Sequence, residues 1–179
     1  VNELLKDNDT IHVFDNFSTG RLDNLPKDNN NIVIHKLDLK SNYHDWPKIK
    51  AKKIFHMAAN ADVRGGLHDQ EKDFNENICV TKSICDYALL NSIDDVVFAS
   101  SATVYGEPTI FPTPENTSLA QTSLYGANKL AGEALLQAYS SYGFFKSSIF
   151  RFVSWTGPGY SHGVIYDFVS KLLNNPNKL

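Results

Sequence analysis

A short apolar run that ends in serine decides the fold of this chain, Val96-Val97-Phe98-Ala99-Ser100. A run of this length, apolar on consecutive residues, is typical of a strand buried on both faces of a parallel sheet. Runs of the same character occur at residues 11–14, 32–35, 53–59 and 148–153. The sequence therefore predicts a sheet of short, buried, parallel strands.

Between these runs, apolar residues recur at helical spacing. One such segment extends from Phe74 to Ala88, a second from Leu124 to Ala138 and a third from Val164 to Leu173. Thr122 or Ser123 can cap the second segment. Strands that alternate with helices imply right-handed crossovers, so we expect an α/β fold with a doubly wound parallel sheet of the Rossmann-like kind.

Composition excludes several classes of function. The chain has 179 residues, 42% of them hydrophobic, and a formal net charge of -3. This charge provides no electrostatic case for a nucleic acid or an anionic membrane as partner. No apolar run approaches the roughly 20 residues of a bilayer span, and no signal-peptide pattern opens the chain. Cys79 and Cys85 lie six residues apart in a helical pattern, a poor geometry for a local disulfide, so we expect a cytoplasmic protein.

A Tyr-x-x-x-Lys pair opens the second helical segment, as Tyr125-Gly126-Ala127-Asn128-Lys129. Residues four apart share one helix face, and a free tyrosine, with a pKa of about 10, is a poor base at neutral pH. A lysine cation favours the phenolate, so the spacing predicts that Lys129 lowers the pKa of Tyr125. Ser101, at the carboxyl end of a buried strand, can donate a hydrogen bond to a substrate oxygen. Such a pair also occurs by chance in helices, and serines at strand ends are often turn formers.

Two motifs together carry a resemblance to a known family. The segment Ser100-Ser101-Ala102-Thr103-Val104-Tyr105-Gly106, followed by the Tyr-x-x-x-Lys pair, resembles the active-site signature of the extended short-chain dehydrogenases/reductases. The likeness is to their NAD-dependent epimerase/dehydratase family, in particular its UDP-glucose 4-epimerase-like members, and it extends from about Val1 to Gly163. It implies an NAD-dependent isomerase in which Ser101, Tyr125 and Lys129 are catalytic.

The same resemblance implies a cofactor site built from several segments. Asp15 would bind the adenosine ribose hydroxyls, which favours NAD over NADP, although an Asp after a strand can equally be a turn starter. His56 lies in a buried run, and we expect it to be a core residue rather than a catalyst. Asn77 matches an Asn that the family uses near the nicotinamide, although an isolated helical Asn is usually a surface residue. The implied cofactor-binding residues are Asp15, Asn16, Ser18, Gly20, Asp38, Leu39, Met57, Ala58, Ala59, Asn77, Ser100, Tyr125, Lys129 and Phe152.

The substrate implied by the resemblance is a nucleotide sugar. Its binding residues would be Ser101, Thr103, Tyr125 and Ser154, and no metal site is expected. Ser154 stands where the family commonly has an Asn, which leaves the identity of the sugar nucleotide open. The family's dehydratases carry Asp-Glu directly after the catalytic hydroxyl, where this chain has Ala102 and Thr103, so an epimerase or a reductase is favoured. A non-catalytic protein that kept the fold is the alternative from another class.

The ends of the chain affect these expectations. Residues 1–6 have the pattern of the second half of a helix, so a central strand and the family's Gly-rich pyrophosphate turn are expected before it. The fold would then be incomplete at its N-terminus. We assign residues 1–163 to a partial NAD-binding domain and residues 164–179 to the start of the substrate-binding region. We expect the full-length protein to form a homodimer, as relatives commonly do.

Overall fold

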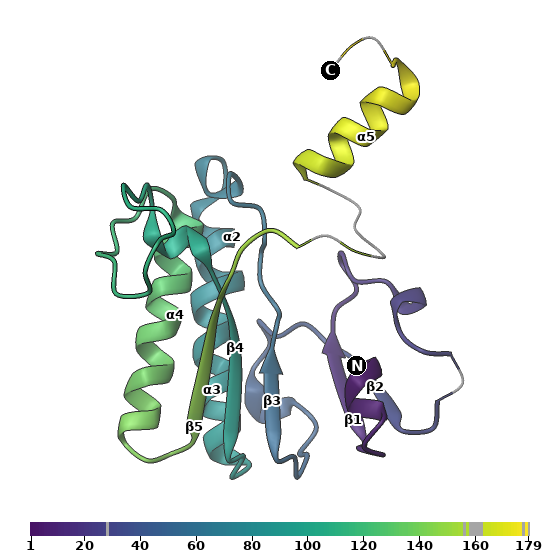
Figure 1. Ribbon diagram of the computed structural model, residues 1–179. Coiled ribbons are helices and arrows are strands. Elements are labelled where there is room, and N and C mark those ends of the chain that lie inside the picture. Colours follow the sequence, from purple (N-terminus) through teal and green to yellow (C-terminus); the bar gives the residue numbers. More distant parts are fainter. Residues whose placement is uncertain (28, 156, 158–162, 177, 179) are drawn as a thin grey trace.

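The protein has an α/β fold in which every strand pair is parallel (Figure 1). The computed structural model describes residues 1–27, 29–155, 157, 163–176 and 178. One sheet pairs β1 with β2, and a second has the strand order β3-β4-β5. The strands are β1 (Ile11–Asp15), β2 (Ile32–Lys36), β3 (Lys53–His56), β4 (Asp95–Ser101) and β5 (Lys146–Phe152).

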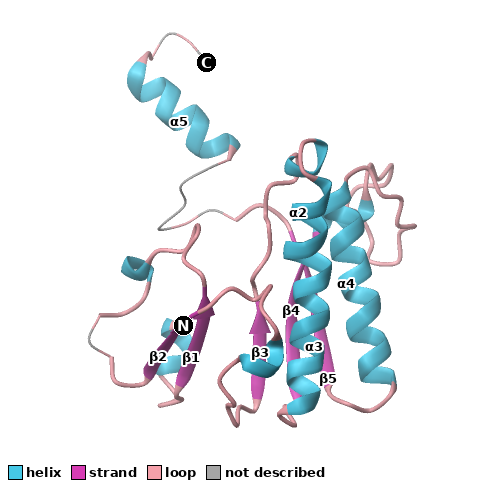
Figure 2. Ribbon diagram, turned by 180° about the vertical axis from the view of Figure 1, so that it is seen from behind, coloured by secondary structure: helices cyan, strands magenta, loops and turns pink. Residues whose placement is uncertain are grey.

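Helices α2 (Gln70–Phe74), α3 (Val80–Leu90) and α4 (Leu124–Ser141) lie together on one face of the β3-β4-β5 sheet (Figure 2). A five-residue π-helical segment, Asn75–Cys79, joins α2 to α3 into one continuous helical stretch, which replaces the single regular helix predicted from the sequence. The side chain of Ser123 caps α4 by accepting a hydrogen bond from the amide of Gly126. The helices are α1 (Asn2–Leu5), α2 (Gln70–Phe74), α3 (Val80–Leu90), α4 (Leu124–Ser141) and α5 (Val164–Asn174).

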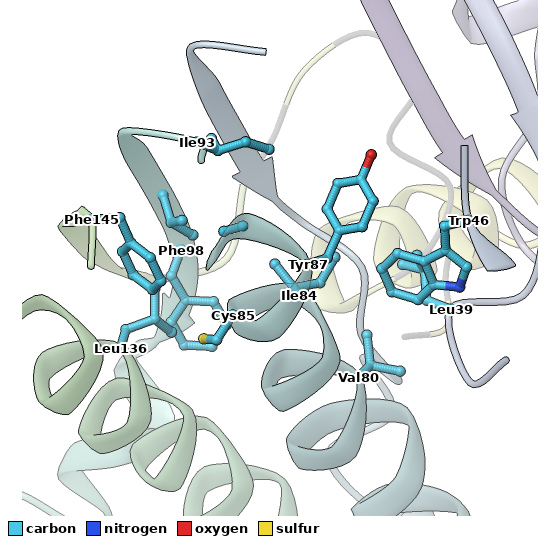
Figure 3. Close-up of a cluster of buried hydrophobic side chains, with 12 residues drawn as sticks. Leu39, Trp46, Val80, Ile84, Cys85, Tyr87, Ile93, Phe98, Leu136 and Phe145 are labelled. Carbon is cyan, nitrogen blue, oxygen red and sulfur yellow. The ribbon is translucent and has the colours of Figure 1, made fainter. Parts of the chain in front are cut away.

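The core lies between β4 and helices α3 and α4, as the buried side chains in Figure 3 show. Phe98 of β4 is 1% exposed and Leu136 of α4 is fully buried. A Cβ atom at Gly132 would lie 3.0 Å from the Phe98 ring, so the absence of a side chain there lets α4 approach the strand closely. A second group of aromatic rings, Trp46 and Tyr87 with Phe14 against them, extends this core towards β1.

The two sheets are separated by a groove of about 680 Å³ between β1 and β3. Apolar side chains from both sides line it, including Ile11, Phe14 and Ile54.

The end of β3 differs from the sequence prediction, and helix α5 lies outside the core. The predicted strand over residues 53–59 ends at His56, because the next three residues turn away at the carboxyl end of the sheet. Helix α5 forms as predicted but has no buried residue, and it stands away from both sheets in Figures 1 and 2. The proposed division at residue 163 therefore stays a prediction. None of the helices in the described part of the chain is long and apolar enough to cross a bilayer.

Candidate active site

The carboxyl end of β4 and the first turns of α4 bring Ser101, Tyr125 and Lys129 together. Ser101 is the last residue of β4, and Tyr125 lies in the first turn of α4. The Ser101 side chain lies close enough to the phenol of Tyr125 to lower its pKa. Lys129, 3% exposed, donates a hydrogen bond from Nζ to the carbonyl oxygen of Ala99 at 2.8 Å, and its Nζ lies 5.8 Å from the centre of the Tyr125 ring. The three residues that the sequence predicted to be catalytic thus share one site.

The electrostatics of the phenol differ from the prediction. The pKa of Tyr125 is raised, first by burial and also by the negative charge of Asp73, while the Ser101 side chain opposes the rise. Burial lowers the pKa of Lys129 to about 8. The predicted lowering of the Tyr125 pKa is therefore wrong for the chain as it stands, because loss of hydration outweighs the stabilisation of the phenolate.

Thr103 completes the end of β4. Its hydroxyl donates to Ser101 Oγ at 2.9 Å, and its carbonyl oxygen approaches α4 so closely that a Cβ at Gly126 would lie 2.9 Å from it. Gly126, inside the Tyr-x-x-x-Lys motif, therefore permits contact between the turn and the helix. Of the predicted substrate-binding residues, Ser101, Thr103 and Tyr125 lie together, whereas Ser154 lies in the exposed segment after β5.

A second cavity, beside the carboxyl ends of β1 and β2, collects half of the predicted cofactor-binding residues. Asp15 accepts a hydrogen bond from the amide of Phe17 at 2.7 Å, so its carboxylate both begins a turn and lines the cavity. Gly20 packs against that carboxylate, because a Cβ there would lie 2.8 Å from Asp15 Oδ2. The predicted residues that line this cavity are Asp15, Asn16, Ser18, Asp38, Leu39, Ala58 and Ala59.

A carboxylate stands on each side of this cavity. Asn16 donates to Asp38 Oδ2 at 3.4 Å, which links the ends of the two strands. The pKa of Asp38 is lowered, chiefly by a hydrogen bond from the amide of Lys40. The cavity therefore presents carboxylate oxygens that can accept hydrogen bonds from hydroxyl groups of a ligand.

Ser100, Met57 and Phe152 are among the seven predicted cofactor-binding residues that do not line this cavity. Ser100 is 4% exposed and donates a 2.5 Å hydrogen bond to Glu133 of α4. Met57 lines the groove between β1 and β3. Phe152 stacks on Phe150 along β5, at a hollow on the other side of β4.

Two buried polar residues resolve alternatives left open by the sequence. His56, 3% exposed, shares a hydrogen bond between its Nε2 and Thr81 Oγ1 at 2.9 Å, which confirms it as a core residue. Asn77 is also 3% exposed, so it is not a surface residue. Its Nδ2 donates to Asp73, while its Oδ1 is buried without a hydrogen-bond partner among the described residues.

Sequence reasoning missed two buried acids near the site, Glu133 and Asp73. Glu133 follows Lys129 by four residues, so the same helical spacing that linked Tyr125 to Lys129 would have placed it on the same face. It accepts three hydrogen bonds from Arg151 of β5, the shortest at 2.8 Å. Asp73 had no such signal, because its partners come from three separate segments.

Comparison with known proteins gives a consistent result. The profile described as the NAD dependent epimerase/dehydratase family matches residues 1–179. The chain is 31% identical to a putative UDP-glucose 4-epimerase of Methanocaldococcus jannaschii, over 100% of this chain and 60% of the relative. It is 32% identical to a UDP-glucose 4-epimerase of Mycolicibacterium smegmatis, over 78% of this chain and 46% of that protein.

Solved structures agree with these relatives. A crystal structure of a UDP-galactose 4-epimerase superimposes with a TM-score of 0.89 at 38% identity, covering 100% of this chain and 59% of the other. A Thermus thermophilus UDP-glucose 4-epimerase in complex with NAD superimposes with a TM-score of 0.82 at 26% identity, covering 90% of this chain and 53% of the other. The chain thus spans at most about 60% of the length of the curated relatives named above. From its profile match, its relatives and its fold, the chain belongs to the NAD-dependent epimerase/dehydratase family.

Proposed function

We propose that the protein carrying this chain is an NAD-dependent epimerase that acts on a nucleotide sugar. The single observation that carries the proposal is the meeting of Ser101, Tyr125 and Lys129 where β4 ends and α4 begins. A protein that kept the fold only for binding or assembly has no physical need for these three side chains in contact. The named relatives are epimerases of UDP-glucose or UDP-galactose, which makes a UDP-sugar the first substrate to test.

The residues present fit NAD. Asp15 and Asp38 offer carboxylate oxygens to ribose hydroxyls, and a carboxylate at Asp15 would repel the 2′-phosphate of NADP. Ala58 and Ala59 also line the cavity, and their small side chains leave room for a ligand. The unpartnered Oδ1 of Asn77 supplies a buried acceptor that a ligand donor could satisfy. When bound, NAD would supply the redox chemistry, taking up a hydride from a sugar carbon and returning it.

The residues of the chain handle the proton. Tyr125 would accept the proton of the sugar hydroxyl, and Ser101 would hold the same oxygen by a hydrogen bond. Because burial raises the pKa of Tyr125, its phenolate needs stabilisation; Ser101 lowers this pKa, and we propose that the Lys129 cation, 5.8 Å from the ring centre, adds to the stabilisation. With a pKa of about 8, Lys129 is mostly protonated at pH 7. In this proposal Tyr125 is the base, Ser101 the hydrogen-bond donor and Lys129 the nearby cation.

The positions after Ser101 favour this reaction over its relatives. A dehydratase needs an acid and a base to expel water, and Ala102 and Thr103 provide no carboxyl group there. A reductase would consume added reduced cofactor stoichiometrically, whereas an epimerase regenerates its NAD in every turnover. The two activities are therefore separated by measuring whether reduced cofactor disappears.

The test is the interconversion of UDP-glucose and UDP-galactose by the protein, prepared with any sequence that flanks the chain in its gene. Tyr125→Phe should lower kcat by about 10²–10⁴-fold while NAD stays bound, because only proton transfer is removed. Tyr142→Phe is the matched control, since Tyr142 lies at the far end of α4 and is 72% exposed. Equal activity of the Tyr125→Phe variant and the wild type would remove Tyr125 from the mechanism.

A further inference from the structure

Asp73 is a fully buried acid whose surroundings are unusual. Its exposed fraction is 0%, and burial raises its pKa. Three side-chain amides oppose this rise, the negative charge of Asp62 adds to it, and no cation in the described part of the chain contributes. Buried carboxylates are ordinarily paired with a cation, because an unpaired charge is costly to remove from water. A purely structural position in α2 would be served as well by an apolar side chain.

The amides that donate to Asp73 come from three segments of the candidate site. Asn128 donates to Oδ2 at 3.0 Å, and Asn77 donates to Oδ1 at 2.9 Å. Asn60 donates to Oδ1 at 3.4 Å. Asn128 lies in α4 between Tyr125 and Lys129, Asn77 lies in the π-helical segment between α2 and α3, and Asn60 directly follows the Ala58-Ala59 pair of the cavity wall.

We propose that Asp73 is a positioning residue for the proposed reaction. It holds the first turns of α4, through Asn128, against the segments that would carry the cofactor. A carboxylate suits this task because its two oxygens can accept hydrogen bonds from amides on two sides at once. The rotation of α4, and with it the placement of Tyr125 against Ser101, then depends on the Asp73–Asn128 contact. This inference rests on the proposed function.

The charge of Asp73 also acts on the phenol. The groups near Tyr125 are Ser101 from β4, Lys129 from α4 and Asp73 from α2. Lys129 in turn lies near His56 of β3, and Asp73 lies near Asp62. The negative charge of Asp73 raises the pKa of Tyr125. A change at Asp73 should therefore be detectable at Tyr125 even where no turnover is measured.

The test compares Asp73→Leu with Asp73→Asn in the whole protein. Leucine keeps the branched shape of the side chain but removes both acceptors, so kcat should fall by about 10-fold or more with a smaller change in KM, as expected for misplaced reacting groups. Asparagine keeps one acceptor oxygen for Asn77 and can donate to a reoriented Asn128 amide, so it should restore part of kcat. A kcat of Asp73→Leu within about twofold of the wild type would overturn the proposal.

A second pair of variants decides the matter if Asp73→Leu does not fold. Asn128→Ala removes only the amide that Asp73 holds on α4, and kcat should fall by several-fold. Asn91→Ala is its control, because Asn91 is a partly buried helix-end Asn whose amide donates to the Tyr87 carbonyl, away from the site. If kcat is no lower in Asn128→Ala than in Asn91→Ala, the proposal fails.

A measurement without turnover separates this inference from the proposed function. Carbon-13 NMR of the Tyr125 ring, assigned with Tyr125→Phe, should show a shifted resonance and a lower pKa in Asp73→Asn, because a negative charge is removed. An inactive wild type with that shift would overturn the proposed function and leave the Asp73–Tyr125 coupling standing. An unchanged Tyr125 resonance in both Asp73 variants would overturn the coupling itself.

Discussion

Acidification should destabilise the fold through one core residue, His56. The hydroxyl of Thr81 donates to the carbonyl of Asn77 at 2.7 Å, so the hydrogen between Thr81 and His56 must belong to His56 Nε2. His56 Nδ1 is therefore the unprotonated nitrogen, and it is buried without a partner among the described residues. A second proton would add a charge and a buried donor with no acceptor. Burial, assisted by the charge of Lys129, accordingly lowers the pKa of His56 to about 3.

The size and sign of the effect follow from linkage. Above pH 6.5 the histidine is neutral in both states, so stability is highest there. Below pH 6.5 His56 becomes protonated in the unfolded chain, whereas in the folded chain it stays neutral down to about pH 3. Each pH unit of acidification in this range therefore lowers the free energy of unfolding by about 1.4 kcal/mol. Between pH 7 and pH 5 the loss should be about 2 kcal/mol. The value depends little on the folded pKa, which lies well below this range.

Urea unfolding at several pH values, followed by circular dichroism, measures this loss. His56→Gln is the informative variant, because glutamine can donate to Thr81 but does not titrate. Carboxyl groups titrate in both proteins, so the difference between the two slopes isolates His56. His68→Gln, at an exposed histidine, controls for the exchange of side chains. Parallel losses of stability in wild type and His56→Gln between pH 7 and pH 5 would refute the assigned tautomer and its consequence.

Two further substitutions test the packing around the site. Gly106→Ala should lower the free energy of unfolding by more than about 2 kcal/mol, since Gly106 has φ +64° and a Cβ would lie 1.8 Å from the carbonyl oxygen of Ala120. Gly143 has φ +77° but faces open space, so Gly143→Ala should lower the free energy of unfolding by only about 1 kcal/mol in the same urea titration. Glu133→Ala should lower the free energy of unfolding by about 3 kcal/mol, because it leaves the guanidinium of Arg151, whose side chain is 21% exposed, without its carboxylate partner. An unchanged urea midpoint would show that the ion pair contributes nothing to stability.

The order of strands and helices could be predicted from the sequence, because apolar runs and helical spacing report burial directly. The end of β3 could not, since Met57, Ala58 and Ala59 continue the apolar run while leaving the sheet. Asp15 was undecided between turn former and ligand-binding residue, and its carboxylate both accepts the turn amide and lines the cavity. The two roles are compatible because a carboxylate has two oxygens and several lone pairs.

The separation of Ser100 from Ser101 was predictable but missed. Successive side chains of a strand point to opposite faces, and the burial of β4 alternates accordingly. Ser100 shares the helix-covered face with Phe98 and contacts Glu133, whereas Ser101 is left at the strand end beside Tyr125. The direction of the Tyr125 pKa was not predictable, because spacing reports that Lys129 is near and says nothing of how deeply the phenol is buried.

Helix α4 and the end of β4 make three contacts, which are one turn apart on the helix and fall on consecutive residues of the strand. Residues 125, 129 and 133 lie one turn apart on α4, and they meet the Ser101 side chain, the Ala99 carbonyl and the Ser100 hydroxyl in turn. Gly126 and Gly132 occupy the intervening points where a Cβ would collide with the strand or its turn. The spacing of the reacting groups is therefore set by how closely a helix can approach a strand, and a methyl group added at either glycine would move all three contacts together.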